Sequence, residues 1–206
     1  MITIIIVIVT SLLSYIAFQR PELMSRYDLS PYRIMQRKEY YRLFTHAFLH
    51  VDWMHLIINM LVFFSFGRYV EMTFIQMADN GIIRSGEFSF ILLFLSSVLI
   101  SSISTLVKKR NDPYYNAVGA SGAVSAILFT SIFFSPLENV YLYGILPLPG
   151  IVFGILYLVY SSYMGRKSKD NINHDAHFWG AVYGLIFPAL LHPAMITNFL
   201  SQIGIY

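Results

Sequence analysis

The chain has no cysteine and few charged residues. The first absence excludes disulfide bonds and thiol catalysis. Charged residues make up 12% of the 206 positions, about half the share usual in soluble domains, whereas hydrophobic residues make up 56%. A soluble fold could not bury that much apolar surface, so the composition predicts a multi-pass integral membrane protein in contact with a lipid bilayer.

Charge of either sign is missing from Met1 to Gln19. A secretory signal peptide begins with a basic region and ends at a small-residue cleavage site, and this segment has neither. We therefore expect it to remain as a first membrane-spanning helix. The 14 basic residues lie mainly between apolar runs and leave a net charge of only +3, which favours contacts with lipid headgroups over nucleic-acid binding.

Six apolar segments approach the roughly 20 residues that cross a bilayer. They cover about Ile2–Phe18, Met54–Met77, Phe88–Val107, Ala120–Phe134, Leu148–Met164 and Ala176–Ile196. The sequence thus predicts an all-α membrane protein with six transmembrane helices in a single domain, residues 1–206. The first loop, Arg20 to Trp53, mixes basic with aromatic residues, so we expect it to lie in the membrane interface as a hairpin.

A serine flanked by glycines opens the fourth segment, in the run Gly119-Ala120-Ser121-Gly122. A serine hydroxyl becomes an effective nucleophile when a base takes its proton, and histidine is the usual base. His177 stands near the start of the sixth segment. With six crossings, the fourth and sixth segments enter the membrane from the same side, so Ser121 and His177 are expected at a similar depth. This placement predicts acyl-transfer chemistry inside the bilayer.

Glycines also predict how these two segments pack. Gly180 and Gly184 are four residues apart, which forms a small-residue face that allows close helix approach. If that face meets the fourth segment, His177 comes within reach of Ser121. Gly119 and Gly122 permit backbone torsions closed to other residues. Taken separately, each glycine motif is also consistent with a plain packing face.

A second polar cluster surrounds the start of the second segment. His46 and His50 precede it, and His55 and Asn59 lie four residues apart on one helix face within it. Side-chain donors could stabilise an oxyanion by roughly 2.7–4 kcal/mol each. Alternatively, they only hold helices together, at about 0.6 kcal/mol each. Taken alone, His55 and Asn59 favour this second, structural interpretation.

A metal site is the rival interpretation of the histidines. Membrane zinc proteases carry His-Glu-x-x-His on a helix, and that motif is absent from the chain. We therefore expect neither a metal nor a cofactor. No acidic residue is placed to orient His177, because Asp175 stands two residues earlier and would point away from it on a helix. The residues favour a Ser–His dyad over a triad.

In combination, these motifs resemble those of the rhomboid family of intramembrane serine proteases. The resemblance covers about Tyr41 to Gly184. It rests on Tyr41-Arg42, the series His46…His50…His55…Asn59, Gly119-x-Ser121-Gly122 and His177-x-x-Gly180-x-x-x-Gly184. It implies a six-helix bundle with a membrane-embedded first loop.

The resemblance also implies a role for each matching residue. Ser121 would be the nucleophile and His177 the general base. The backbone amides of Ser121 and Ala120, with the side chains of His55 and Asn59, would form the oxyanion hole. Other matching positions would support the site or the bundle, namely Gly119, Gly122, Gly180, Gly184, His46, His50, Arg42 and Glu71.

Two features depart from the family pattern. Four residues after the nucleophile, many members carry an aromatic ring that stacks on the catalytic histidine, whereas this chain has Ser125. Another group must therefore hold His177. In addition, all basic residues except Arg68 and Arg84 fall in the first, third and fifth loops, which the positive-inside rule would turn to the cytoplasm. The family's active site faces outward instead, and we keep that orientation as the prediction.

The sequence therefore predicts a serine endopeptidase that cuts transmembrane protein substrates in a bacterial inner membrane. The family resemblance implies that substrates enter laterally, between the second and fifth helices. Its water-filled hollow would be lined by His46, His50, His55, Asn59, Asn116, Ser121 and His177. One alternative is a proteolytically inactive rhomboid-like protein that binds membrane clients, although such proteins typically lack the serine or the histidine. A transporter or channel would need charged residues at mid-membrane, which the segments lack.

Overall fold

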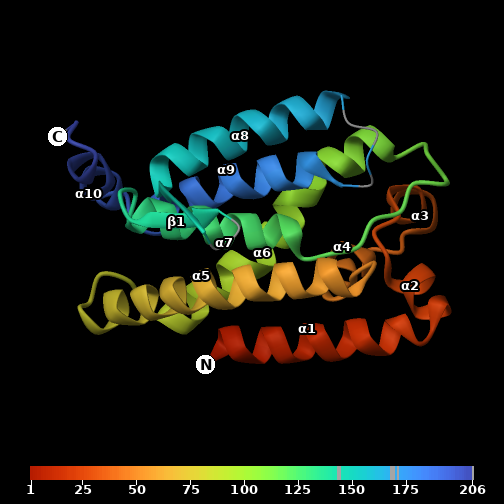
Figure 1. Ribbon diagram of the computed structural model, residues 1–206. Coiled ribbons are helices and arrows are strands. Elements are labelled where there is room, and N and C mark those ends of the chain that lie inside the picture. Colours follow the sequence, from red (N-terminus) through yellow and green to blue (C-terminus); the bar gives the residue numbers. More distant parts are fainter. Residues whose placement is uncertain (143–144, 168–169, 171, 206) are drawn as a thin grey trace.

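The computed structural model describes residues 1–142, 145–167, 170 and 172–205 and is mostly helical (Figure 1). The elements in chain order are α1 (Ile2–Phe18), α2 (Pro21–Tyr27), α3 (Pro31–Arg37), α4 (Arg42–Thr45), η1 (His46–Phe48), α5 (Trp53–Asp79), α6 (Gly86–Lys109), α7 (Ser121–Phe134), β1 (Asn139–Leu142), β2 (Leu146–Pro149), α8 (Gly150–Lys167), α9 (His174–Leu191) and α10 (Met195–Gln202).

Polar side chains and prolines set where several of these helices begin. The side chains of Asp52, Ser85 and Asn173 precede α5, α6 and α9, and each accepts a hydrogen bond from a backbone amide in the first turn. Such caps satisfy amides that have no partner within the helix. Pro21 and Pro31 occupy the first position of α2 and α3, where a missing amide hydrogen costs nothing.

A helix lies at each of the six predicted apolar segments, namely α1, α5, α6, α7, α8 and α9. The last predicted segment is too long, because α9 ends at Leu191 and α10 is a separate helix. His192 has an extended backbone, as expected for the residue before Pro193. The structure therefore corrects the sixth boundary and leaves the other five within a few residues.

The segment between α7 and α8 contains the only strands among the described residues. β1 and β2 pair antiparallel, with Asn139 opposite Pro149 and Val140 opposite Leu148. The all-α prediction is therefore wrong at this point, although the fold is mostly helical. Strand β2 leads directly into α8, and the amide of Gly150, the first residue of α8, donates to the carbonyl of Glu138 at 2.8 Å.

The first loop, which we expected to lie in the membrane interface as a hairpin, folds into the short helices α2, α3, α4 and η1. Figure 1 shows them gathered at one end of the long helices, beside the segment that leads into α7. Backbone hydrogen bonds join the two regions, since Leu29 and Ala117 exchange them at 2.8 and 3.1 Å. The first loop is therefore attached to the chain that carries Ser121.

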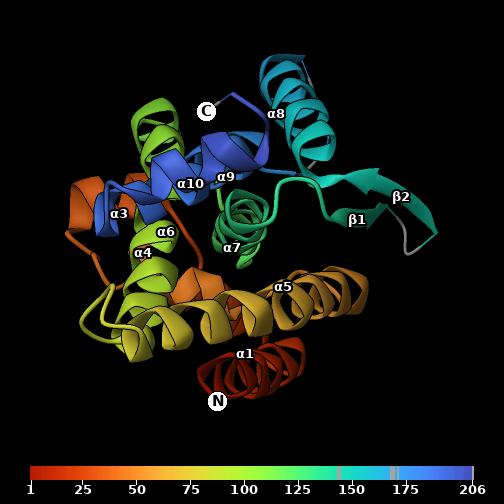
Figure 2. The ribbon, with the colours of Figure 1, turned by 90° about the vertical axis from the view of Figure 1, so that its left-hand side faces the viewer.

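Helix α7 forms the centre of the bundle. Every residue from Gly122 to Phe133 is buried, and Figure 2 shows α7 end-on between α5, α6, α8 and α9. Phe63, Phe90 and Phe94 belong to the buried aromatic core around it, and Phe129 of α7 is buried as well. In the same view α1 lies outside α5, far from α7. Because α7 is enclosed by the other helices, Ser121 stands at the start of a buried helix.

Helix α1 is polar inside and apolar outside. It buries Thr3, Thr10 and Ser14, whereas Ile5, Ile8 and Leu12 are each more than half exposed. This pattern suits lipid as the surrounding solvent, because polar groups in a membrane must be satisfied within the bundle. By length and composition, α5 and α6 could each cross a membrane, and α1 and α7 are shorter apolar helices.

Glu71 of α5 fastens the beginning of α1. Its buried carboxylate accepts hydrogen bonds from the amides of Ile2 and Thr3 at 2.8 and 3.1 Å, and from the Thr3 hydroxyl at 2.7 Å. A carboxylate at a helix N-terminus also interacts favourably with the helix dipole. These contacts join α5 to the beginning of α1.

Candidate active site

Ser121 is the first residue of α7, and the residues before it are fixed by the backbone. Gly119 has φ of +126°, which side chains other than glycine rarely adopt. A β-carbon there would lie 2.6 Å from Cε1 of His55. The His55 ring therefore packs directly on the turn that presents Ser121, and Gly119 is required both for its torsion and for this contact.

Glycines bring α7 and α9 into backbone contact. A β-carbon at Gly180 would lie 2.1 Å from the carbonyl oxygen of Gly122, and one at Gly184 would lie 2.1 Å from the carbonyl oxygen of Ala126. The small-residue face predicted for the sixth segment thus meets the fourth segment. Ser121 precedes Gly122 by one residue and His177 precedes Gly180 by three, so the two candidates occupy adjoining parts of touching helices.

The His177 ring is half-buried and lies against aromatic rings. Tyr157 of α8 stacks on it, with ring centroids 6.4 Å apart and planes 26° from parallel. The His174 ring meets it edge-on at 6.0 Å. Among the described residues, the Ser121 hydroxyl and the His177 ring form no hydrogen bond to each other, so the dyad stays a prediction.

Asp175 does not contact His177. Its two carboxylate oxygens accept hydrogen bonds from Nζ of Lys108, at 2.8 and 2.7 Å. This contact ties the start of α9 to the end of α6 and agrees with the expectation that Asp175 points away from the imidazole. Tyr157 was missed by the sequence analysis, since an aromatic residue on a helix with few buried residues carries no local signal of such a contact.

Of the four polar residues around the start of α5, His50, His55 and Asn59 contact one another in series, and His46 has separate partners. Nδ1 of His46 bonds the carbonyl of Arg42 at 2.8 Å, and Nδ1 of His50 bonds the Ser14 hydroxyl at 3.0 Å. His50 is fully buried and meets the His55 ring edge-on at 4.9 Å. Burial lowers the pKa of His46 to about 4, so this imidazole is neutral at physiological pH.

Asn59 lies one turn below His55. Its side-chain amide donates to the His55 carbonyl at 2.9 Å and is buried. An amide group has two donor hydrogens, so one remains for another acceptor. Nδ1 of His55 is buried without a hydrogen-bond partner among the described residues. These contacts fit both interpretations of the pair, as oxyanion donors and as structural groups.

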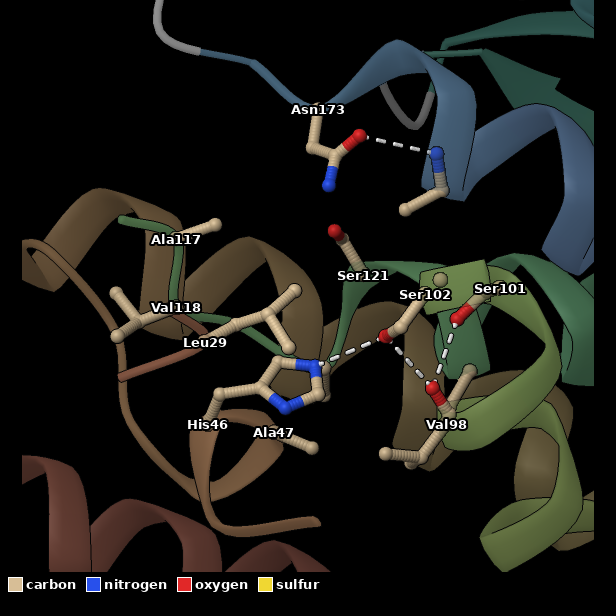
Figure 3. A pocket seen from close by; sticks show the side chains of 15 residues that line it. Leu29, His46, Ala47, Val98, Ser101, Ser102, Ala117, Val118, Ser121 and Asn173 are labelled. Carbon is tan, nitrogen blue, oxygen red and sulfur yellow. Dashed lines mark hydrogen bonds between the residues drawn. The ribbon is translucent and has the colours of Figure 1, made fainter. Parts of the chain in front are cut away.

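A cavity of about 20 Å³ adjoins Ser121 (Figure 3). Its polar lining comes from His46, Ser101, Ser102, Ser121 and Asn173, and Figure 3 shows Ser121 between Asn173 on one side and His46 on the other. A polar cavity of this size can hold a water molecule. It is framed by α6, α7 and the start of α9.

The lining differs from the predicted one. Asn116 is exposed and bonds the nearby carbonyl of Tyr114, so the prediction that it lines the hollow is wrong. His50, His55, Asn59 and His177 also lie outside this cavity. Ser101, Ser102 and Asn173 were missed, because serines within an apolar helix and an asparagine at a helix start have ordinary structural explanations.

Arg42 anchors the first loop from inside. It is 2% exposed, and its guanidinium donates to the carbonyls of Ser25 and Asp28 at 3.1 and 3.0 Å, to the Asp28 carboxylate, and to Oε2 of Glu39 at 2.6 Å. The Arg42 hydrogen bond lowers the pKa of Glu39, whereas burial raises the pKa of Asp28. This network agrees with the structural role that the family resemblance implies for Arg42.

The backbone also connects the first loop to the candidate nucleophile. The amide of Gly119 donates to the carbonyl of His46 at 3.0 Å, in addition to the pair of bonds between Leu29 and Ala117. These three bonds fix the chain immediately before Ser121. Within the described part of the chain, no group of three His, Cys, Asp or Glu side chains is arranged to hold a metal ion.

Comparison with known proteins gives a family match. The sequence model of the rhomboid domain matches residues 37–194. The chain is 27% identical over 159 residues to "RHOMBOID-like protein 12, mitochondrial" of Arabidopsis thaliana, covering 70% of this chain and 44% of that protein. It is 28% identical over 152 residues to "Putative rhomboid protease YdcA" of Bacillus subtilis (strain 168), covering 74% and 67%.

A third relative is "Rhomboid-like protein 11, chloroplastic" of Arabidopsis thaliana, 27% identical over 165 residues, covering 74% of this chain and 52% of that protein. The chain therefore spans about half the length of the two plant relatives it matches. By their names these proteins belong to mitochondria, chloroplasts and a bacterium, so they give no particular support to the bacterial inner membrane expected from the sequence.

Proposed function

Because the chain belongs to the rhomboid family, we propose that it is an intramembrane serine endopeptidase that cleaves transmembrane protein substrates through Ser121 and His177. The observation that carries the proposal is the backbone contact of α7 and α9 at Gly122 and Gly180. Two unrelated packing helices would have no reason to bring a serine and a histidine to the same end of such a contact.

The proposal includes the membrane arrangement. Helices α1, α5, α6, α7, α8 and α9 cross the bilayer as one domain over residues 1–206, and the first loop lies in the interface. Exposed apolar side chains on α1 and α5 support lipid contact. Tyr40, Tyr41 and Phe44 are exposed on the first loop, as expected for aromatic residues at the headgroup level.

In the acylation step, the Ser121 oxygen forms a bond to the carbonyl carbon of the scissile peptide while its proton passes to a ring nitrogen of His177. The carbon–nitrogen bond then breaks, and His177 gives the proton to the leaving amine. An imidazole can take and return a proton in this way because its ordinary pKa lies near neutrality.

The developing negative charge on the carbonyl oxygen needs hydrogen-bond donors. Backbone amides at the start of α7 have no partner within the helix, which makes those of Ala120 and Ser121 suitable. His55 and Asn59 supply side-chain donors from α5. The packing of the His55 ring on Gly119 supports this assignment, because it places the imidazole beside the turn that carries Ser121.

The second half-reaction needs water at membrane depth. A water molecule attacks the acyl ester while His177 takes its proton, and the proton returns to the Ser121 oxygen as the ester bond breaks. The cavity beside Ser121, with polar groups from His46, Ser102 and Asn173, supports the supply of water to Ser121, and a water leaving it would have to move toward His177, which lies outside the lining.

Cleavage by the purified protein tests the proposal. In detergent, it should cut a model transmembrane segment, and both Ser121→Ala and His177→Ala should abolish the cut. Ser131→Ala, which removes a hydroxyl ten residues further along the same helix that bonds the Leu128 carbonyl, controls for the loss of a serine from α7. Cleavage that persists in Ser121→Ala would exclude this nucleophile.

Labelling with a fluorophosphonate separates the peptidase from the alternative of an inactive client-binding protein. The reagent should attach to Ser121 in the unmodified chain and not in Ser121→Ala. A well-folded protein that captures transmembrane segments without labelling or cutting them would support the alternative instead.

A further inference from the structure

Tyr157 supplies a ring next to His177 that position 125 does not supply in this chain. Many family members stack a ring on the histidine from the position four residues after the nucleophile, and this chain has a hydroxyl there. In the structure the ring comes from another helix, since Tyr157 of α8 lies nearly parallel to the His177 ring. The Ser125 hydroxyl lies 2.6 Å from the Tyr157 hydroxyl, so the two positions act together.

The direction of these hydrogen bonds follows from counting hydrogens. The Ser125 hydroxyl donates its one hydrogen to the Ser121 carbonyl at 2.8 Å. The Tyr157 hydroxyl must then donate to Ser125. Tyr157 is therefore linked to both residues of the proposed dyad, because its ring stacks against His177 and its hydroxyl is connected to the Ser121 carbonyl through the Ser125 hydroxyl.

Neighbouring rings limit the movement of Tyr157. Phe129 of α7 and Phe153 of α8 lie 5.3 and 5.8 Å from it, measured between ring centroids. A side chain held by two rings and a hydroxyl bond has few alternative rotamers. It can therefore fix the orientation of the imidazole that it covers.

Helix α8 is otherwise lightly attached. Its buried residues are Gly150, Gly154 and Ser161, and most of its side chains are at least partly exposed. A second ring pair also joins α8 to α9, since the Tyr160 ring meets the His174 ring edge-on with centroids 5.8 Å apart. Tyr157 and Tyr160 are three residues apart, as are His174 and His177, so two aromatic pairs join α8 to the start of α9.

We propose that Tyr157 is the positioning residue of His177, so that the base is aligned only while α8 is packed against α7 and α9. This inference rests on the proposed peptidase function. Movement of α8 away from the bundle would withdraw the ring, and the imidazole would lose the contact that orients it toward Ser121. A misplacement of a reacting group by about 1 Å can cost about 100-fold in rate.

Kinetics of cleavage by the full-length protein test the proposal. Tyr157→Leu keeps an apolar side chain but removes the ring face, and we expect kcat to fall at least tenfold with KM within about twofold. Tyr157→Phe keeps the face and should retain kcat within about threefold. Tyr160→Leu is the matched control, because it removes a ring from the same helix that faces His174 and not His177.

An exchange variant distinguishes positioning from a general loss of packing. Ser125→Tyr combined with Tyr157→Ser moves the ring to α7 and conserves the total side-chain volume. We expect this double variant to recover most of the kcat lost in Tyr157→Leu. An unchanged kcat in Tyr157→Leu, or an equal loss in Tyr160→Leu, would overturn the assignment.

A spectroscopic readout keeps the proposal testable without activity. The Cε1 proton of His177, assigned by its absence in His177→Asn, should carry an upfield ring-current shift that is kept in Tyr157→Phe and lost in Tyr157→Leu. If the unmodified protein neither cuts nor reacts with a fluorophosphonate, the proposed function fails, and an unchanged His177 shift in Tyr157→Leu overturns the positioning role separately.

Discussion

The carbonyl oxygen of Gly122 occupies the space where Gly180 would carry a β-carbon, at a separation of only 2.1 Å. Gly180→Ala should therefore push α9 away from α7 and destabilise the protein by about 1–3 kcal/mol, the usual cost of overpacking. The rate of cleavage should fall by more than the loss of folded protein explains, because His177 moves with α9. Thermal unfolding and turnover measured on the same preparation check both effects.

Gly154→Ala is the matched control for that substitution. A β-carbon at Gly154 would meet Phe129 at 3.4 Å, an ordinary contact distance. We expect a change in stability of less than about 0.5 kcal/mol, as for substitutions without a specific conflict. Equal losses in Gly154→Ala and Gly180→Ala would show that the contact between α7 and α9 has no special importance.

Asp175→Asn should leave the turnover rate within about twofold of the unmodified protein. Its carboxylate bonds Lys108 and does not contact His177, so the imidazole needs no charge from it. Because both side chains are partly exposed, the loss of the ion pair should cost at most about 1 kcal/mol. If turnover instead drops by roughly two orders of magnitude or more while the protein stays folded, Asp175 completes a triad and the dyad is contradicted.

The protein should lose stability as the pH falls from about 6.5 to about 4. Burial lowers the pKa of His46 from 6.5 to about 4, so in this range the unfolded chain binds a proton that the folded chain does not. The loss from this group approaches about 3 kcal/mol at the low end. In His46→Gln, the number of protons taken up on unfolding between pH 4 and 6.5 should be lower by about one, so the free energy of unfolding depends less on pH. Above pH 7 the free energies of unfolding of both proteins should show the same small dependence on pH.

Arg42→Ala should unfold the first loop. The guanidinium is buried with the carboxylate of Asp28, and removal of one partner from such a pair costs about 3–5 kcal/mol. Arg42→Lys should recover only part of this loss, since an ammonium group cannot reproduce the planar set of donors. Denaturant unfolding in detergent measures both variants.

Arg33→Ala provides the comparison for Arg42. Arg33 donates one exposed hydrogen bond, to the Ser25 carbonyl at 3.0 Å, so its removal should cost no more than about 1 kcal/mol. A first loop that tolerates Arg42→Ala as well as Arg33→Ala would contradict the anchoring role.

The positions of the main helices could be predicted from the sequence because their signals are local. Long apolar runs act over a single segment, and the helices lie where these runs placed them. The contact between α7 and α9 was also predictable, since Gly180 and Gly184 are spaced as one helix face requires. Family membership followed from the same motifs and is confirmed by the rhomboid domain match.

Contacts that depend on helix rotation could not be predicted in this way. Tyr157 stands 20 residues before His177 in the chain, and only the packing of α8 shows that their rings meet. The pair of strands β1 and β2 was missed because each strand is four residues long and β2 contains prolines at positions 147 and 149. Asn116 was misplaced because a polar residue near a motif need not face the cavity.

The three backbone hydrogen bonds before α7, made at Leu29, His46, Ala117 and Gly119, have an evolutionary consequence. Main-chain groups are the same in almost every residue type, so many substitutions at positions 29 and 117 would leave these bonds in place. Proline is the exception, because it has no amide hydrogen to donate. Homologous chains can therefore diverge widely in this region and still present the serine in the same position.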